Sequence, residues 1–186
     1  MVRTFIAIEI PAIIRSTITD LQNTLKKDPA RIGWVKVDNI HITLKFLGDV
    51  ERSKIEIISQ AVTQACKIFN PFSVRVAGVG AFPNMHRPRV IWVGATSENE
   101  SLVRLAMSIQ TALEPLGFPR EKQSFKAHLT IGRVKDTNYI ERVMHRLNGY
   151  SSFDGGSFEV KQIIVMQSEL RSTGSVYTPL FVAELK

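Results

Sequence analysis

Two short segments of this sequence carry the same pair of chemically useful side chains at the same spacing. One begins at His41 and reads His-Ile-Thr-Leu, and the other begins at His128 and reads His-Leu-Thr-Ile. On a β-strand, side chains two positions apart point to the same face. His41 would therefore share a polar face with Thr43. In the same way His128 would share one with Thr130, while the aliphatic residues of both segments face a core.

Two imidazoles and two hydroxyls are suited to acid–base chemistry at a phosphate. The unperturbed pKa of histidine is about 6.5, so at neutral pH one imidazole can be protonated while the other is neutral. Displacement at phosphorus needs a base for the nucleophile, an acid for the leaving oxygen and donors for the phosphoryl oxygens. The histidines could supply the acid and the base, and the hydroxyls of Thr43 and Thr130 could supply the donors.

Two other roles for paired histidines fit the sequence less well. Imidazoles also bind metals, but a catalytic metal site normally adds carboxylates or a third histidine. Neither His-x-Thr segment contains Asp or Glu, and the sequence has no His-Glu-x-x-His segment. We therefore expect no metal at this pair of histidines. Histidines that make only structural hydrogen bonds are the second alternative, and the matched setting of the two segments argues against it.

The two segments occupy equivalent places in a twofold repeat of predicted elements. Each half reads strand, helix, histidine strand, helix, strand. His41 follows Phe5 by 36 positions, and His128 follows Val90 by 38. The predicted strands cover residues 4–10, 41–47, 72–80, 90–93, 128–134, 158–168 and 176–185, and the predicted helices lie within 11–25, 55–69, 97–116 and 140–149. This layout predicts a single α+β domain over residues 1–186, built as two lobes related by a pseudo-twofold.

The composition is that of a globular protein with a basic surface. Apolar residues make up 44% and charged residues 22% of the chain, and the formal net charge is +7. A basic balance favours polyanionic partners such as nucleic acid. No stretch reaches the ~20 apolar residues that span a bilayer, and the N-terminus does not read as a signal peptide. The single cysteine, Cys66, excludes an intrachain disulfide and is predicted to be a buried structural thiol. We expect a cytoplasmic monomer without a membrane partner.

Together with other motifs along nearly the whole chain, these segments resemble a known family. The segments that carry the resemblance are, in chain order, Arg3–Ile8, Trp34–Val35, His41–Gly48, Phe82–Gly94, His128–Arg133, Ser168–Leu170, Gly174 and Tyr177. The sequence is similar to the two-histidine (2H) phosphoesterases, in particular to the RNA 2′,3′-cyclic phosphodiesterases historically called 2′-5′ RNA ligases. It departs from that family where Lys126 and Ala127 precede the second motif in place of the frequent Arg-Pro.

The resemblance implies both a fold and a reaction. The family fold is a two-lobed α+β structure with an antiparallel sheet in each lobe and an active site in the central cleft. The first-motif histidine of the family donates a proton to the leaving 3′ oxygen, and the second activates water, which makes His41 the acid and His128 the base. The implied substrate is RNA with a 2′,3′-cyclic phosphate end, tRNA fragments included. The implied product is a 2′-phosphate, formed without a metal or nucleotide cofactor.

Two other functions use the same residues. In the reverse reaction, an RNA 5′-hydroxyl would replace water and the product would be a 2′-5′ linkage between RNA ends. A module that binds RNA at the same place without turnover would belong to a different functional class. The intact pair of histidines argues against that module.

Charged residues beside the motifs are candidates for contacts with phosphate. The guanidinium of Arg133 can fork onto phosphate oxygens, but on strict alternation it faces away from His128. This role therefore requires the strand to bulge or end there. Lys45 has the same parity as the catalytic candidates of its own strand, which predicts either a phosphate contact or a charge at the rim of the site.

Three aromatic residues near the motifs are candidates to stack against a nucleobase, as proteins that bind single-stranded RNA ends often do. Trp34 and Phe125 lie in the loops that precede the two histidine strands, and both are predicted to bind substrate. Phe46 has the parity of the core residues, so we predict that it packs in the interior.

Overall fold

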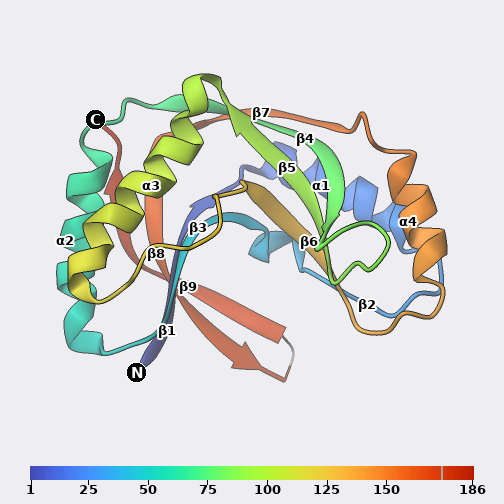
Figure 1. Ribbon diagram of the computed structural model, residues 1–186, viewed down its shortest axis with the longest axis horizontal. Helices are drawn as coiled ribbons and strands as arrows, with labels where there is room; N and C mark the ends of the chain where they lie inside the picture. Colours follow the sequence, from blue (N-terminus) through green and yellow to red (C-terminus); the bar gives the residue numbers. More distant parts are fainter. Residues whose placement is uncertain (173) are drawn as a thin grey trace.

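The strands of both halves pair into one curved antiparallel sheet (Figure 1). The computed structural model describes residues 1–172 and 174–186. Within these residues the sheet has nine strands in the order β7-β4-β5-β6-β3-β1-β8-β9, with β2 paired to β6 beside this path. The strands are β1 (Val2–Glu9), β2 (Ile32–Trp34), β3 (His41–Val50), β4 (Phe72–Phe82), β5 (Val90–Ser97), β6 (His128–Val134), β7 (Asp154–Val160), β8 (Gln162–Arg171) and β9 (Gly174–Glu184).

The sheet divides into two lobes that are joined, within the described residues, at a single residue pair. Lobe A contains β3, β1, β8 and β9, and lobe B contains β6, β5, β4 and β7 together with β2. Where β3 meets β6, Ile42 pairs with Leu129. These residues directly follow His41 and His128, so the junction of the lobes brings the two His-x-Thr motifs together.

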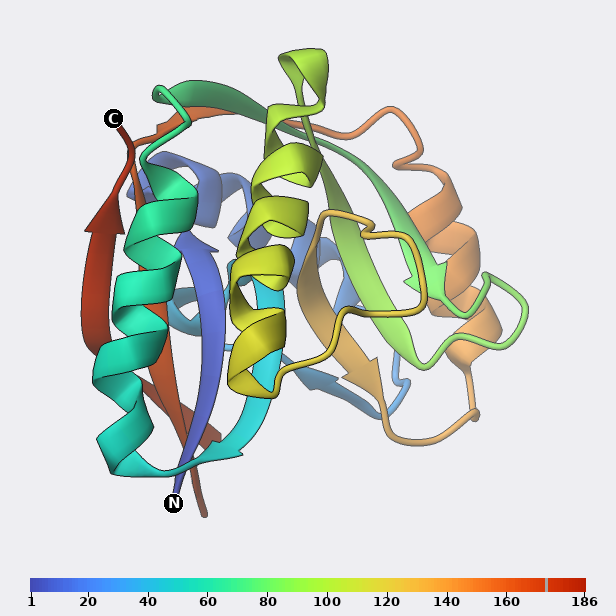
Figure 2. The same ribbon diagram turned by 60° about the vertical axis from the view of Figure 1, so that its left-hand side comes forward.

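The helices cover the sheet in two pairs, one on each lobe (Figures 1 and 2). Their bounds are α1 (Ala12–Leu25), α2 (Ile55–Cys66), α3 (Ser101–Leu113) and α4 (Ile140–Asn148). Helices α2 and α3 pack side by side against lobe A, and α1 and α4 pack against lobe B. Each helix buries one apolar stripe, as Ile14, Ile18 and Leu21 of α1 illustrate. Among the described residues, none of the helices has the length and apolar character needed to span a membrane.

Each half of the chain contributes elements to both lobes. Helix α1 follows β1 of lobe A but packs on lobe B, and α3 follows β5 of lobe B but packs on lobe A. The last strands of the two halves are exchanged as well, since β4 pairs with β5 and β8 pairs with β1. The prediction of a two-lobed α+β fold is confirmed, and the structure adds that neither lobe is made from one half of the chain alone.

One predicted strand is two strands in the structure. The sequence predicted a strand over residues 158–168, but β7 ends at Val160 and β8 begins at Gln162. Strand β7 pairs with β4 in lobe B, whereas β8 pairs with β1 in lobe A. The chain therefore crosses from one lobe to the other at Lys161.

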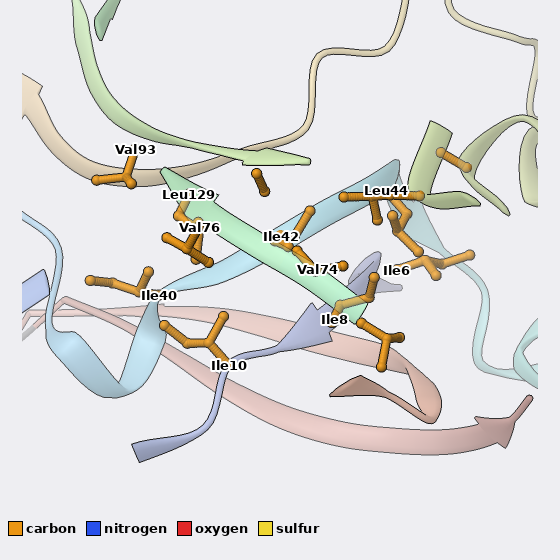
Figure 3. Close-up of a cluster of buried hydrophobic side chains, with 14 of the residues drawn as sticks. Ile6, Ile8, Ile10, Ile40, Ile42, Leu44, Val74, Val76, Val93 and Leu129 are labelled. Atoms are coloured by element: carbon orange, nitrogen blue, oxygen red, sulfur yellow. The ribbon is translucent and has the colours of Figure 1, made fainter. Parts of the chain in front are cut away.

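A hydrophobic core runs through both lobes (Figure 3). Ile6 and Leu44 of lobe A and Val93 of lobe B belong to it, and each is at most 1% exposed. Full burial of one such side chain contributes about 1.5–3 kcal/mol relative to an exposed position. Ile42 and Leu129 are part of the same core, so packing as well as pairing fixes the junction of the lobes.

Strand β3 contains a β-bulge directly after its His-x-Thr motif. Thr43 and Lys45 pair with consecutive residues of β1, which leaves Leu44 as an extra residue. One extra residue reverses the alternation of side chains beyond it. Lys45 is therefore buried, with 6% of its surface exposed, whereas 57% of the surface of Phe46 is exposed. The prediction that Phe46 packs in the interior was wrong for this reason.

Strand β6 contains a bulge at the equivalent place. Thr130 and Gly132 pair with consecutive residues of β5, which leaves Ile131 as the extra residue. Beyond this bulge Arg133 is exposed and shares the side of the sheet that carries the histidine and threonine of the motif. The condition that the sequence set for a role of Arg133 at the site, a bulge in its strand, is therefore met.

Candidate active site

The two His-x-Thr motifs lie on one face of the sheet, at the junction of the lobes. The paired residues of the junction point into the core, so the residues on either side of them point to the opposite face. These residues are His41, Thr43, His128 and Thr130, each half-buried. We call their side of the sheet the histidine face.

Hydrogen bonds fix the orientation of the His41 ring. Its Nδ1 lies 2.8 Å from the carbonyl oxygen of Asn39. Because a carbonyl oxygen only accepts, Nδ1 must carry the proton, and the neutral ring leaves its Nε2 bare. Nε2 lies 3.0 Å from Oγ1 of Thr43. The nitrogen that is free to exchange protons with a substrate is therefore Nε2, with a hydroxyl beside it.

Aromatic rings enclose the other sides of His41. The ring of Phe5 stacks on it at 4.8 Å between centroids, and the ring of Tyr177 meets it edge-on at 5.3 Å. Burial lowers the pKa of His41 below its ordinary value, although the hydrogen bond to the Asn39 carbonyl opposes this shift. The positive charges of Arg133 and of protonated His128 lower the same pKa further.

A hydrogen bond to the backbone also orients the His128 ring. Its Nδ1 donates to the carbonyl oxygen of Lys126 at 2.7 Å, again two residues before the histidine. Its Nε2 is therefore the bare nitrogen of the neutral ring. The ring of Phe82 meets His128 edge-on at 4.9 Å. The charge on His128 lowers the pKa of His41, so the two imidazoles are close enough to interact across the junction.

The structure brings two more side chains to the histidine face. Arg133 follows the bulge of β6, and it is the largest source of positive charge that acts on His41. Phe46 follows the bulge of β3 and lies beside Phe5, with ring centroids 5.8 Å apart. The sequence had placed Arg133 among the phosphate ligands and had placed Phe46 in the core.

Lys45 lies on the opposite side of the sheet, and the prediction that it contacts substrate is corrected here. Its ammonium donates to the carbonyl oxygen of Pro119 at 2.6 Å and lies 3.9 Å from a carboxylate oxygen of Glu121. The bulge at Leu44 reverses the parity on which the prediction depended. Lys45 anchors the loop after α3 to the sheet.

Of the two aromatic residues predicted to stack against a base, Trp34 has a packing role instead. Trp34 is paired with Gly132, and a Cβ added to that glycine would lie 3.1 Å from the indole ring. The ammonium of Lys26, at the end of α1, lies 6.0 Å from the centre of the same ring. Trp34 therefore faces α1 and not the histidine face. Phe125 is half-buried against the main core, and its stacking role stays a prediction.

Sequence reasoning missed the aromatic residues that enclose the histidines. Phe5 contacts His41, while Phe82 contacts both His128 and Trp92. A signal was available for Phe5, because it precedes His41 by 36 positions and Trp92, which contacts Phe82, precedes His128 by the same 36. Tyr177 reaches its place through the β8–β9 hairpin, whose far end extends from the rest of the sheet in Figure 1.

Other reactive groups in the described part of the chain are few. Burial raises the pKa of the Cys66 thiol to about 12, so this cysteine is not a nucleophile at neutral pH. No three His, Cys, Asp or Glu residues among residues 1–172 and 174–186 are grouped so that they could hold a metal ion.

Comparison with known proteins adds independent findings. The family model described as LigT like Phosphoesterase matches the chain twice, over residues 8–92 and 93–177. A protein of Archaeoglobus fulgidus named RNA 2′,3′-cyclic phosphodiesterase is 40% identical, covering 98% of this chain and 99% of its own. A protein of the same name from Methanocaldococcus jannaschii is 36% identical over 94% of this chain and 96% of its own. The crystal structure of a Thermus thermophilus protein superposes with a TM-score of 0.81 at 26% identity, covering 98% and 97% of the two chains.

Proposed function

The chain belongs to the LigT-like family of two-histidine phosphoesterases, and on that premise we propose that it hydrolyses RNA 2′,3′-cyclic phosphate ends to 2′-phosphomonoesters. One observation carries the proposal. Each half of the chain that matches the family model contains one His-x-Thr motif, and the fold joins the two motifs at the pair formed by Ile42 and Leu129. The curated relatives with this name, which align over nearly the full chain, support the substrate class.

In the proposed reaction, the two Nε2 atoms transfer the protons. Nε2 of His128 accepts a proton from water, and the water oxygen forms a bond to phosphorus. The bond between phosphorus and the 3′ oxygen breaks, and Nε2–H of protonated His41 gives its proton to that oxygen. The product keeps the phosphate on the 2′ oxygen, and His128 returns its proton to solvent. Thr43 and Thr130 donate hydrogen bonds to the phosphoryl oxygens, and the guanidinium of Arg133 neutralises part of their charge.

The lowered pKa of His41 fits the acid role when the substrate is included. Burial, Arg133 and His128 favour the neutral ring in the free protein. A phosphodiester anion beside the ring favours the protonated form and offsets the charge of Arg133. His41 would then take up its proton as the substrate binds. The protonated ring that serves as the acid would therefore form mainly when substrate is bound.

Single replacement of either histidine tests the proposal. With a nucleoside 2′,3′-cyclic phosphate as substrate, His41→Ala and His128→Ala should each lower kcat at least ~100-fold while the circular dichroism spectrum is unchanged. His145→Ala is the matched control, because this exposed histidine lies on α4. Normal turnover by either site variant would remove the proposal. The phosphate of the product should be on the 2′ oxygen, the rate should depend on pH as a bell-shaped curve, and a chelator should not change it.

The proposal also covers the natural substrate, the oligomeric state and the cellular location of the protein. We infer that the protein acts as a monomer in the cytoplasm on RNA fragments with cyclic phosphate ends, such as cleaved tRNA. The net charge of +7 supports a polyanionic substrate. Incubation with the two halves of a cleaved tRNA would show whether a 5′-hydroxyl can replace water, because joined product requires the 2′-5′ linkage. Binding of RNA without any consumption of cyclic phosphate would instead indicate a non-catalytic module.

A further inference from the structure

The side chain of Lys135 lies over Gly33 of strand β2, at a place that a larger residue would fill. The backbone N–H of Lys135 donates to the carbonyl oxygen of Arg31 at 2.9 Å, which continues the β2–β6 pairing by one rung beyond Val134. A Cβ added to Gly33 would lie 2.8 Å from Cε of Lys135 and 3.7 Å from its Nζ. Gly33 is paired with Arg133. The lysine side chain therefore leans back along the strand, toward Arg133 and the histidine end of β6.

Lys135 and Arg133 form a row of positive charge on the histidine face. The bulge after Thr130 turns Arg133 to this face, and Lys135, two residues further along, shares it. Both side chains are exposed. Neither takes part in the salt bridges of the described chain, whereas the neighbouring Arg31 lies 3.8 Å from Asp136. Two adjacent cations without a carboxylate partner repel one another and attract an anion.

The equivalent row in lobe A carries no cation of its own strand. Counted from the bulge after each motif, Phe46 corresponds to Arg133. A second bulge, at Leu47, then puts the acidic Asp49 on the same face as Phe46, where lobe B has Lys135. One lobe therefore offers an aromatic surface beside the histidines, and the other offers two cations. An RNA end has the same two chemical parts, since its bases are aromatic and its backbone carries a phosphate at each nucleotide.

We propose that Lys135, laid across Gly33 beside Arg133, binds the phosphate on the 5′ side of the terminal nucleotide of the RNA. This inference rests on the proposed function. A cyclic phosphate closes the 3′ end, so the remainder of the RNA leaves the site from the 5′ side of that nucleotide. With the reacting phosphorus between the histidines and within reach of Arg133, a backbone phosphate is the anion available to Lys135, the next cation along β6. The substrate class is thus an oligonucleotide, because a nucleoside 2′,3′-cyclic phosphate has no phosphate at this position.

The test compares two substrates in one set of variants. The substrates are a nucleoside 2′,3′-cyclic phosphate and a dinucleotide that ends in a 2′,3′-cyclic phosphate. Lys135→Gln should lower kcat/KM for the dinucleotide about tenfold, as loss of a hydrogen bond to a charged group does, and change it less than about twofold for the mononucleotide. The slope of log kcat/KM against log salt for the dinucleotide should weaken by about 0.7.

Two further variants show whether the position of the Lys135 side chain matters or only the total positive charge of the protein. Gly33→Ala keeps the charge but puts a methyl group where the lysine stem lies, so it should weaken selectivity for the dinucleotide in the same direction. Lys67→Gln removes an exposed lysine at the end of α2 and should change neither substrate. Equal losses on both substrates, or no loss on the dinucleotide, would overturn the inference. If the unaltered protein turned over neither substrate, the proposed function would fail first.

Discussion

His41 and His128, each with the residues around it, form the two half-sites at the junction of the lobes. Both rings make the same hydrogen bond to the backbone, but their surroundings differ. In both, Nδ1 donates to the carbonyl oxygen two residues earlier, which leaves Nε2 for the substrate. His41, however, lies between the rings of Phe5 and Tyr177, whereas the edge of Phe82 is the aromatic contact of His128. The repeat has kept the orientation of the imidazoles and changed what encloses them.

In the proposed mechanism, this difference explains how a duplicated motif supplies two opposite proton transfers. An acid and a base need the same reach to the phosphorus but different protonation states. Orientation comes from the local backbone, so it is repeated with the motif. Protonation depends on burial and on nearby charge, which come from elements far away in the sequence such as β9 and β6. Changes at those elements should therefore alter one half-site and not the other.

Arg133→Gln should have the largest effect on the contrast between the half-sites. Loss of the guanidinium removes a charged hydrogen-bond donor to the phosphate, so kcat/KM should fall about tenfold or more. The pKa of His41 in the free protein should rise, because a cation that disfavours its protonated form is gone. Titration of the His41 ring by NMR measures this shift. Arg142→Gln, at an exposed position on α4, should leave both quantities unchanged.

Phe46→Ala changes the half-site of lobe A and should weaken substrate binding by less than Arg133→Gln lowers kcat/KM. If the exposed ring stacks on the terminal base, its removal should raise KM for a cyclic purine nucleotide about fivefold or more, since such a stacking contact is worth ~1–3 kcal/mol. The value of kcat should stay nearly constant, because Phe46 does not touch the reacting atoms. Phe46→Tyr keeps an aromatic ring and should retain the KM of the original protein. An unchanged KM in Phe46→Ala would assign the exposed ring no part in binding.

The smallest predicted effect is on stability. Because burial lowers the pKa of His41 in the folded protein, the folded state binds fewer protons than the unfolded state around the ordinary histidine pKa. His41 therefore stabilises the fold above the unfolded-state pKa, and this stabilisation is lost as the pH falls through the folded-state pKa. The Tm should decrease less between pH 8 and about 5.5 in His41→Asn than in the original protein. An identical decrease in both proteins would show that burial of this ring is not linked to protonation.

The parts of the site that could be predicted from the sequence depend on local spacing. The pairs of His41 with Thr43 and of His128 with Thr130 follow from strand geometry within three residues. The faces of Lys45 and Phe46 do not, because they depend on how β3 registers against β1. A bulge depends on how two strands pair, so it cannot be predicted from the spacing of residues within one strand.

The same reason explains what could be predicted of the fold. The order of strands and helices follows from periodicity, and so does the existence of two lobes. The partner of each element does not, since β7 and β8 are separated at Lys161 alone and yet pair with strands of different lobes. The aromatic enclosure of His41 is of this kind, because Tyr177 reaches it from 136 positions away.

Within the described residues, the sheet passes from one lobe to the other through one β3–β6 pair, and this has a mechanical consequence. A rotation of one lobe relative to the other about Ile42 and Leu129 would displace each atom in proportion to its distance from that pivot. His41 and His128 adjoin the pivot, whereas Phe46 and Lys135 lie roughly 10–20 Å along their strands from it. Any such rotation would therefore change the distance between Phe46 and Lys135 much more than the distance between the two histidines.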